Sequence, residues 1–223
     1  MADLVITIDG PAGSGKSTAA RLLAARLEAK FLDTGAMYRA VTLAAMRKGA
    51  ESAGEEALLK VMDDTEFSFS LTDDTMLVSI NGVDVTEDIR GPEVTANTKY
   101  AASAAKVRAR LVEMQRQFAA GAGKIVSEGR DQGTVAFSDA DFKFFLTASA
   151  GERARRRRLE LEAKGAEGSL EEIRSAIEAR DESDLSRSFG PLRPAKDAVV
   201  IDTTDLSVED VVEKLMEYVG KDD

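Results

Sequence analysis

The sequence has 223 residues, of which 40 are acidic and 30 are basic, and its formal net charge is −10. It contains no cysteine, histidine or tryptophan. The chain therefore cannot form disulfides, a thiolate nucleophile, a zinc-finger or iron–sulfur site, or a Ser-His-Asp triad. Any catalysis must use carboxylates, lysine, arginine, hydroxyl groups and backbone dipoles.

The length predicts one globular domain that covers 1–223. The negative charge argues against a general nucleic-acid-binding protein, because a polyanion would be repelled. No apolar run approaches the ~18 residues of a membrane span, and the first residues lack the pattern of a signal peptide. We therefore expect a cytoplasmic protein that binds neither nucleic acids nor membranes.

The first elements along the chain are typical of a βαβ unit. Residues 4–8 form a β-branched apolar run that predicts a buried strand, and a glycine-rich loop follows it. Apolar residues at helical spacing predict a helix over 17–29. A short strand at 31–32 and a helix from about 36 to 48 come next.

The periodicity changes between about 65 and 86. Apolar and polar residues alternate strictly at 66–71, and two apolar runs flank Asn81-Gly82, a strong signal for a two-residue hairpin. This segment predicts a small antiparallel sheet that is inserted into the fold. The alanine-rich stretch from about 93 to 120 contains no proline and predicts one long helix or two adjacent helices.

Three further apolar strands are predicted at 124–127, 142–146 and 198–201. Helices with N-terminal capping boxes are expected between and after them. The boxes are Ser149 with Glu152, Ser169 with Glu172, and Ser207 with Asp210. Strands that alternate with helices predict an α/β fold with a mostly parallel sheet.

The residues after the first strand match the phosphate-binding motif G-x-x-x-x-G-K-[ST]. Glycines let backbone N–H groups converge on phosphate oxygens, and the following helix directs its positive dipole end to the same point. Lys16 would reach the β- and γ-phosphates, and the Ser17 hydroxyl would bind Mg²⁺. The predicted nucleotide-binding residues are Gly10, Pro11, Ala12, Gly13, Ser14, Gly15, Lys16, Ser17 and Thr18.

Two other segments place arginine where a strand meets a loop or helix. Thr34 opens a predicted helix, and Arg39 lies one turn further on, which is a suitable arrangement for holding a phosphate. Arg130 and Asp131 directly follow the strand at 124–127. Ligands of open α/β sheets bind at the carboxyl ends of strands, so these residues are candidates for a second phosphate-bearing ligand.

Arginines are concentrated between 153 and 187. Arg153, Arg156 and Arg157 share one helical face, and Arg180, Asp184 and Arg187 follow in a second helical segment. A basic helix could be a docking patch for nucleic acid. A lid that closes over nucleoside phosphates explains the arginines better, because arginines neutralise a transferring phosphoryl group.

With these motifs the sequence resembles bacterial cytidylate kinases, a family of nucleoside-monophosphate kinases. The resemblance covers almost the whole chain and depends on ITIDGPAGSGKST, LDTGAMYRA, GRDQGTVAF, RDxxDxxR followed by PL, and DAxxIDTT. It implies a P-loop kinase fold in which helices flank a central five-stranded parallel sheet. The expected parts are a core at about 1–35, 98–148 and 188–223, a monophosphate-binding part with the small antiparallel sheet at about 36–97, and a helical lid at about 149–187.

The resemblance also implies a reaction and a set of substrate contacts. ATP would phosphorylate CMP or dCMP in the presence of Mg²⁺, in a protein that acts as a monomer. Cytosine recognition would include a residue where the family usually has serine and this chain has Lys99, with Thr98 or Ser103 as alternatives. By position, Thr34, Arg39, Arg130 and Arg187 would hold the acceptor phosphate, Arg180 and Asp184 the ribose hydroxyls, and Asp131 and Arg108 the cytosine edge.

No general base is required for this reaction, because the attacking phosphate oxygen is already an anion. We expect catalysis by Lys16, by Mg²⁺ bound to Ser17, and by the lid residues Arg153 and Arg157. Asp33 or Asp131 is a further candidate for holding Mg²⁺ through water. Two alternatives remain open, namely a P-loop kinase with another small acceptor such as UMP and a nucleic-acid-associated P-loop NTPase.

Overall fold

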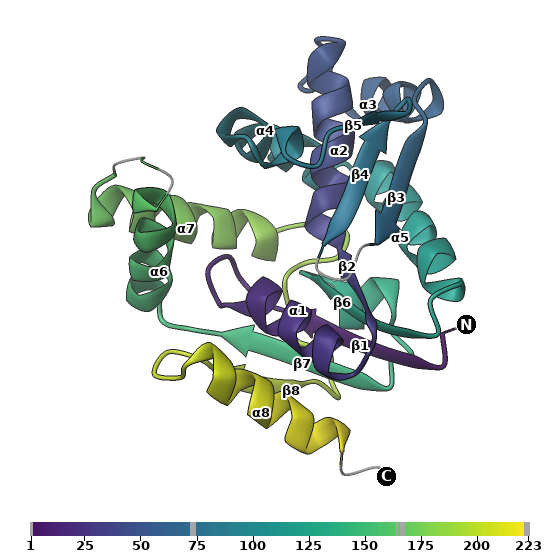
Figure 1. Ribbon diagram of the computed structural model, residues 1–223. Coiled ribbons are helices and arrows are strands. Elements are labelled where there is room, and N and C mark those ends of the chain that lie inside the picture. The colour runs from purple at the N-terminus through teal and green to yellow at the C-terminus, as the bar shows by residue number, and fades with distance from the viewer. Residues whose placement is uncertain (1, 72–74, 164, 166–167, 221–223) are drawn as a thin grey trace.

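The computed structural model describes residues 2–71, 75–163, 165 and 168–220. Its centre is a sheet of five parallel strands in the order β2-β6-β1-β7-β8, shown in Figure 1. This arrangement confirms the predicted α/β fold with a central five-stranded parallel sheet. The strands are β1 (Leu4–Asp9), β2 (Lys30–Asp33), β6 (Lys124–Gly129), β7 (Phe142–Thr147) and β8 (Val199–Asp202).

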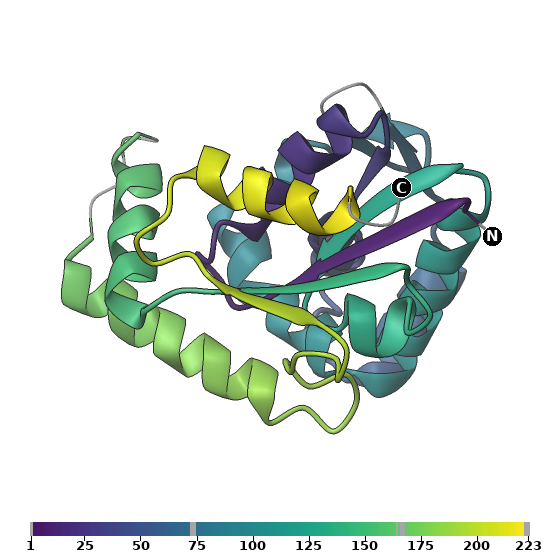
Figure 2. The same ribbon diagram turned by 90° about the horizontal axis from the view of Figure 1, so that it is seen from below.

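Helices cover both faces of this sheet. The pleat of β6 points Ile125 and Val126 to opposite faces, and each belongs to a different apolar cluster. On one face lie α1 (Lys16–Arg26) and α8 (Val208–Val219), which Figure 2 shows above the strands. On the other face lie α2 (Thr34–Arg47) and α5 (Ala105–Ala120).

The predicted antiparallel sheet is present beside α2. It contains β3 (Phe67–Leu71), β4 (Met76–Ile80) and β5 (Val83–Asp84) in sequential order. Asn81 and Gly82 connect β4 to β5 with positive φ angles of 51° and 77°, as a two-residue hairpin turn requires. The helix α3 (Glu55–Asp63), which precedes this sheet, was not predicted from the sequence.

The alanine-rich stretch folds as two helices. The short 3₁₀ helix η1 (Asp88–Arg90) leads into α4 (Pro92–Ser103), and α5 begins after the extended residue Ala104, with φ −80° and ψ 109°. This break turns the chain so that α4 packs against α2 and α5 packs against the sheet layer.

Two helices after β7 project from the carboxyl edge of the sheet (Figure 1). They are α6 (Ala150–Glu162) and α7 (Leu170–Leu185), and they share a separate apolar cluster. Full capping boxes are present at Ser169 and Ser207. At Ser149 only the hydroxyl caps the helix, because Glu152 binds Arg155 and Arg156 instead of completing the box.

None of the described helices combines the length and the hydropathy that crossing a bilayer requires.

Candidate functional site

The glycine-rich loop connects β1 to α1 at the carboxyl edge of the sheet. Gly10 has a φ of 152°, and a Cβ at this position would overlap the carbonyl of Leu146. Gly15 has a φ of 83° and precedes the first residue of α1, Lys16. The loop therefore follows a path that side chains would block, and it leaves the N–H groups at the start of α1 free for an anion.

A cleft of about 260 Å³ opens beside this loop, between the start of α2, the end of β6, α4 and α7. Six basic and four acidic side chains line it. The cleft thus carries positive charge in a chain whose net charge is −10, which suits an anionic ligand. The basic residues are Lys16, Arg39, Arg108, Arg130, Arg180 and Arg187, and the acidic ones are Glu128, Asp131, Glu160 and Asp184.

Lys16 and Ser17 both face Glu128, which lies near the end of β6. The Ser17 hydroxyl donates a hydrogen bond of 2.9 Å to Glu128 Oε1, and Lys16 Nζ lies 4.0 Å from Glu128 Oε2. Burial lowers the pKa of Lys16 and raises that of Glu128, while their mutual attraction opposes both changes. Glu128 was not among the predicted site residues, although it immediately precedes the segment that drew attention to Arg130.

The start of α2 carries the predicted Thr34 and Arg39. The Thr34 hydroxyl donates to the carbonyl of Glu128 at 2.7 Å, which joins α2 to β6. Asp33 caps the helix by accepting from the N–H of Ala36 at 2.9 Å. Asp33 also pairs with Arg39 at 3.1 Å and lies 3.8 Å from Arg90, so its carboxylate is occupied by guanidinium groups.

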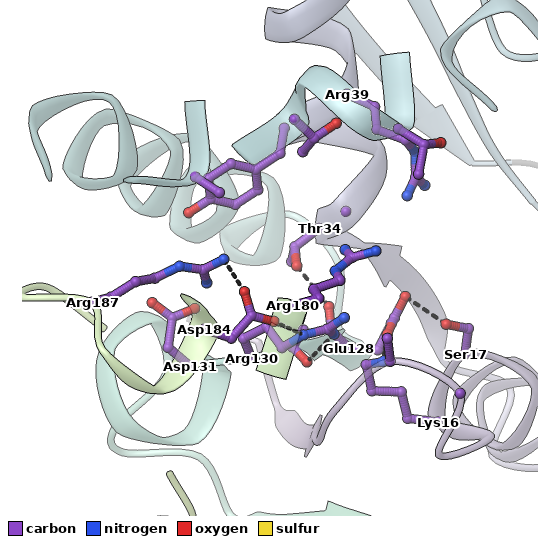
Figure 3. A pocket seen from close by; sticks show the side chains of 18 of the residues that line it. Lys16, Ser17, Thr34, Arg39, Glu128, Arg130, Asp131, Arg180, Asp184 and Arg187 are labelled. Atoms are coloured by element: carbon purple, nitrogen blue, oxygen red, sulfur yellow. Dashed lines mark hydrogen bonds and ion pairs between the residues drawn. The ribbon is translucent and has the colours of Figure 1, made fainter. Parts of the chain in front are cut away.

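Three predicted residues meet around Asp184 of α7, as Figure 3 shows. Arg130 Nε donates to Asp184 Oδ2 at 2.9 Å, and Arg187 pairs with Asp184 Oδ1. Arg180 lines the same cleft and makes no ion pair with any residue that the structure describes. The buried Asp184 therefore holds two cations in place, and the guanidinium group of Arg180 is left for a ligand.

Arg108 and Asp131 form a buried ion pair at one side of the cleft. Arg108 also donates to the carbonyls of Ala102 (3.0 Å) and Gly190 (3.3 Å). Its guanidinium carbon lies 5.4 Å from the ring centre of Tyr38. The Tyr38 hydroxyl is buried and has no hydrogen-bond partner among the described residues, and burial raises its pKa.

The lid candidates Arg153 and Arg157 occupy different environments. Arg153 is buried, pairs with Asp181 at 2.6 Å and donates to the carbonyl of Ala12 in the glycine-rich loop at 3.2 Å. The Arg157 side chain is 42% exposed and pairs with Glu160 at the rim of the cleft. Arg156 is turned toward the end of β8, where it donates to the hydroxyl and carbonyl of Thr203, the residue after the strand.

Of the three candidates for contacting the base on α4, only Thr98 lines the cleft. Lys99 is exposed, and its Nζ lies 5.2 Å from the ring centre of Tyr100. Ser103 is exposed and donates to the carbonyl of Tyr100. Each residue turns the helix by about 100°, so Lys99 points away from the face that carries Thr98. The geometry gives no support to the role predicted for Lys99.

The sequence is similar to known proteins along nearly its full length. The family profile described as Cytidylate kinase matches residues 6–221. A cytidylate kinase of Carboxydothermus hydrogenoformans is 46% identical over 216 residues, which cover 97% of each chain. One of Geobacter sulfurreducens is 48% identical over 212 residues, covering 95% of this chain and 91% of the relative.

The chain is also similar to solved structures, among them a shikimate kinase from Bacteroides thetaiotaomicron. The sequence identity is 15% and the TM-score is 0.48, and the match covers 97% of this chain and 98% of that one. The family profile and the curated relatives place this chain, with its phosphate-binding loop and arginine-lined cleft, in the cytidylate kinase family.

Proposed function

We propose that this chain transfers the γ-phosphoryl group of ATP to CMP or dCMP, which gives ADP and CDP or dCDP. The proposal is supported by the family to which the chain belongs and by relatives named cytidylate kinase. The observation that carries it is the cleft in which the loop lysine Lys16 shares one cavity with arginines from α2, α7 and the segment directly after β6. Such a cleft suits two phosphate-bearing ligands that meet end to end.

The ATP phosphates would bind to the glycine-rich loop. The free N–H groups at the start of α1 and the Lys16 ammonium would surround the β- and γ-phosphates. Arg153 already contacts this loop through the carbonyl of Ala12, so a guanidinium group lies beside the donor site. Arg157 would have to leave Glu160 to take part, and its catalytic role remains a prediction.

Mg²⁺ fits the residues at the start of α1. It prefers oxygen ligands and usually combines one or two protein groups with water and phosphate oxygens. Ser17 Oγ and the carboxylate of Glu128 lie together there and offer a hydroxyl and an anionic oxygen. A bound Mg²⁺ would neutralise charge on the transferring phosphoryl group. Asp33 and Asp131 are less suited than Glu128, because both are paired with arginine.

The acceptor would occupy the side of the cleft lined by α2, α4 and α7. Its phosphate would meet the Thr34 side chain and three guanidinium groups, those of Arg39, Arg130 and Arg187. Arg180 and Asp184 would take the ribose hydroxyls, and Arg108 with Asp131 would contact the base edge. We further propose α6 and α7 as the lid, residues 36–97 as the monophosphate-binding part, and the remainder as the core.

The chemistry places few demands on the side chains. The acceptor phosphate oxygen is an anion and attacks without a base, so the protein contributes alignment and positive charge. Arginine suits this purpose because its planar fork binds two phosphate oxygens at once. The absence of histidine is therefore no obstacle to the reaction.

A coupled assay of ADP formation across nucleoside monophosphates tests this function. We expect CMP and dCMP to be phosphorylated with the highest kcat/KM, and ADP formation to be negligible without an acceptor. A clear preference for UMP would change the substrate assignment. ADP formation at an equal rate without any acceptor would instead identify an NTPase. Lys16→Ala should reduce turnover by orders of magnitude, about 10³-fold, in a folded protein.

A further inference from the structure

Asp9 is a buried carboxylate to which the proposed reaction assigns no role. It is the last residue of β1, directly before the glycine-rich loop, and it is 3% exposed. Its Oδ1 accepts a hydrogen bond of 2.8 Å from the N–H of Gln132, and its Oδ2 accepts one of 2.8 Å from the N–H of Gly133. Both oxygens thus bind the first residues of the π-helix η2 (Gln132–Ala136).

This helix directly follows two residues of the acceptor site, Arg130 and Asp131. Asp131 occupies the N-cap position, but its side chain does not cap the helix because it pairs with Arg108. Asp9 supplies the missing acceptors from a neighbouring strand. The contact therefore links the strand that leads into the donor loop with the segment that carries the acceptor site.

The start of η2 is also tightly packed against β1. A Cβ on Gly133 would lie 2.9 Å from Thr7 Oγ1 and 3.5 Å from Asp9 Oδ2, so η2 approaches β1 as closely as glycine allows. A buried carboxylate is costly unless hydrogen bonds compensate it, and burial raises the pKa of Asp9 to about 7. A neutral side chain would be easier to bury, so the two hydrogen bonds from η2 are what a carboxylate at this position provides.

We propose that Asp9 is a positioning residue for the acceptor site. Its carboxylate fixes the start of η2, and thereby holds Arg130 and Asp131 at a set distance from the donor loop. The inference rests on the proposed function for the identity of the two substrates. It adds a group that touches neither of them and sets the position in which the acceptor binds relative to the donor.

The test is the KM of each substrate in Asp9→Asn. Asparagine keeps the shape but offers one acceptor oxygen, so one N–H of η2 loses its partner. The KM for CMP should rise about tenfold, while the KM for ATP stays within about twofold. Asp141→Asn is the matched control, because its Oδ2 also accepts a backbone N–H from β1, at the opposite end of the strand (Val5, 2.7 Å). It should leave both KM values unchanged.

A second pair of variants moves η2 without changing the charge. Gly133→Ala should raise the KM for CMP in the same way, and adding Thr7→Ala should restore it, because the colliding hydroxyl is removed. Equal rises in the KM for CMP and the KM for ATP would overturn the proposal. An unchanged KM for CMP in Asp9→Asn, or in Gly133→Ala, would overturn it as well. If the wild-type protein prefers a nucleoside monophosphate other than CMP or dCMP, the substrate assignment fails, and the same comparison with that acceptor still decides the role of Asp9.

Discussion

The Ser17 hydroxyl donates a hydrogen bond of 2.9 Å to Glu128 Oε1, across 111 positions of sequence. The parallel pairing of β1 with β6 brings them together, because it sets Asp9 beside Gly129 at the edge where α1 begins. Glu128 also lies 4.0 Å from Lys16 Nζ. One carboxylate therefore orients the lysine and the hydroxyl of the glycine-rich loop.

Glu128→Gln tests the proposed Mg²⁺ site. Glutamine keeps the shape of the side chain but removes the negative charge. We expect the Mg²⁺ concentration for half-maximal activity to rise by about ten- to a hundredfold. The measurement is a Mg²⁺ titration at saturating ATP and CMP. Glu213→Gln is the control, because Glu213 pairs with Arg26 on the surface. An unchanged Mg²⁺ requirement in Glu128→Gln would remove Glu128 from the site.

Arg39→Ala tests the acceptor phosphate contact. Removal of a charge-assisted hydrogen bond should raise the KM for CMP by about ten- to a hundredfold and leave the KM for ATP unaffected. Arg39→Lys should recover little of this loss, because lysine cannot form the planar two-bond contact. Steady-state kinetics with each substrate varied in turn gives both values. An effect confined to the KM for ATP would place Arg39 on the donor side.

Gly190→Ala tests the contact between the segment after α7 and the ion pair proposed to bind the base. Gly190 has a φ of 60°, and a Cβ there would overlap the carboxylate of Asp131. Displacement of Asp131 and Arg108 should raise the KM for CMP about tenfold or more. Gly49→Ala is a matched control, because Gly49 has a φ of 61° and a Cβ added there would meet no atom within 4 Å. It should lower stability by about 1 kcal/mol through backbone strain and leave the kinetics unchanged.

Separate alanine variants distinguish the two lid arginines. Arg153→Ala should lower kcat and also destabilise the protein by about 3 kcal/mol, because it leaves the carboxylate of Asp181 without its cation. Arg157→Ala should retain wild-type stability, because its pair with Glu160 is exposed. If Arg157 acts in transfer, its variant lowers kcat without raising the KM for CMP. A normal kcat in both single variants and in the double variant would show that other residues supply the charge.

The parts of the fold that follow from local signals were predictable. Each of them depends on residues that are close together in the sequence, as in the buried strands, the Asn81-Gly82 turn and the caps at Ser169 and Ser207. The break at Ala104 is different, because alanine favours helix and only the packing of α4 and α5 against separate partners explains the turn. The nine-residue helix α3 was missed, although its spacing of Leu58, Val61 and Met62 is helical.

In the candidate site, too, local motifs were predictable from the sequence and contacts between distant segments were not. The motifs predicted the phosphate-binding loop and the arginines, and the structure brings those from α2, α7 and the segment directly after β6 to one cleft. The partners of these groups could not be read from the sequence, because they depend on strand order. Glu128 reaches Ser17 only when β6 lies beside β1, and Tyr38 reaches Arg108 only when α2 packs near α5. The difference between Arg153 and Arg157 likewise depends on how α6 sits against the loop.

Asp9 should also shape the pH dependence of stability. Its pKa in the folded protein is about 7, above the ordinary value of 3.8, chiefly because of burial and further because of Asp131; the N–H groups of η2 and the charge of Arg130 oppose the rise. A raised folded-state pKa means that folding favours the protonated form. The stabilisation is therefore complete below about pH 4 and is lost as the pH rises through 7.

Asp9→Asn has no such titration, so its melting temperature relative to wild type should increase from pH 5 to pH 8. At pH 8 the free energies of unfolding of the two proteins should differ by about a few kcal/mol as a result of this titration. Thermal unfolding of both proteins at several pH values, followed by circular dichroism, measures this. A variant that is more stable than wild type at pH 8 and yet binds CMP more weakly would separate the positioning role from a structural one. A constant difference across this range would show that Asp9 does not change its charge near pH 7.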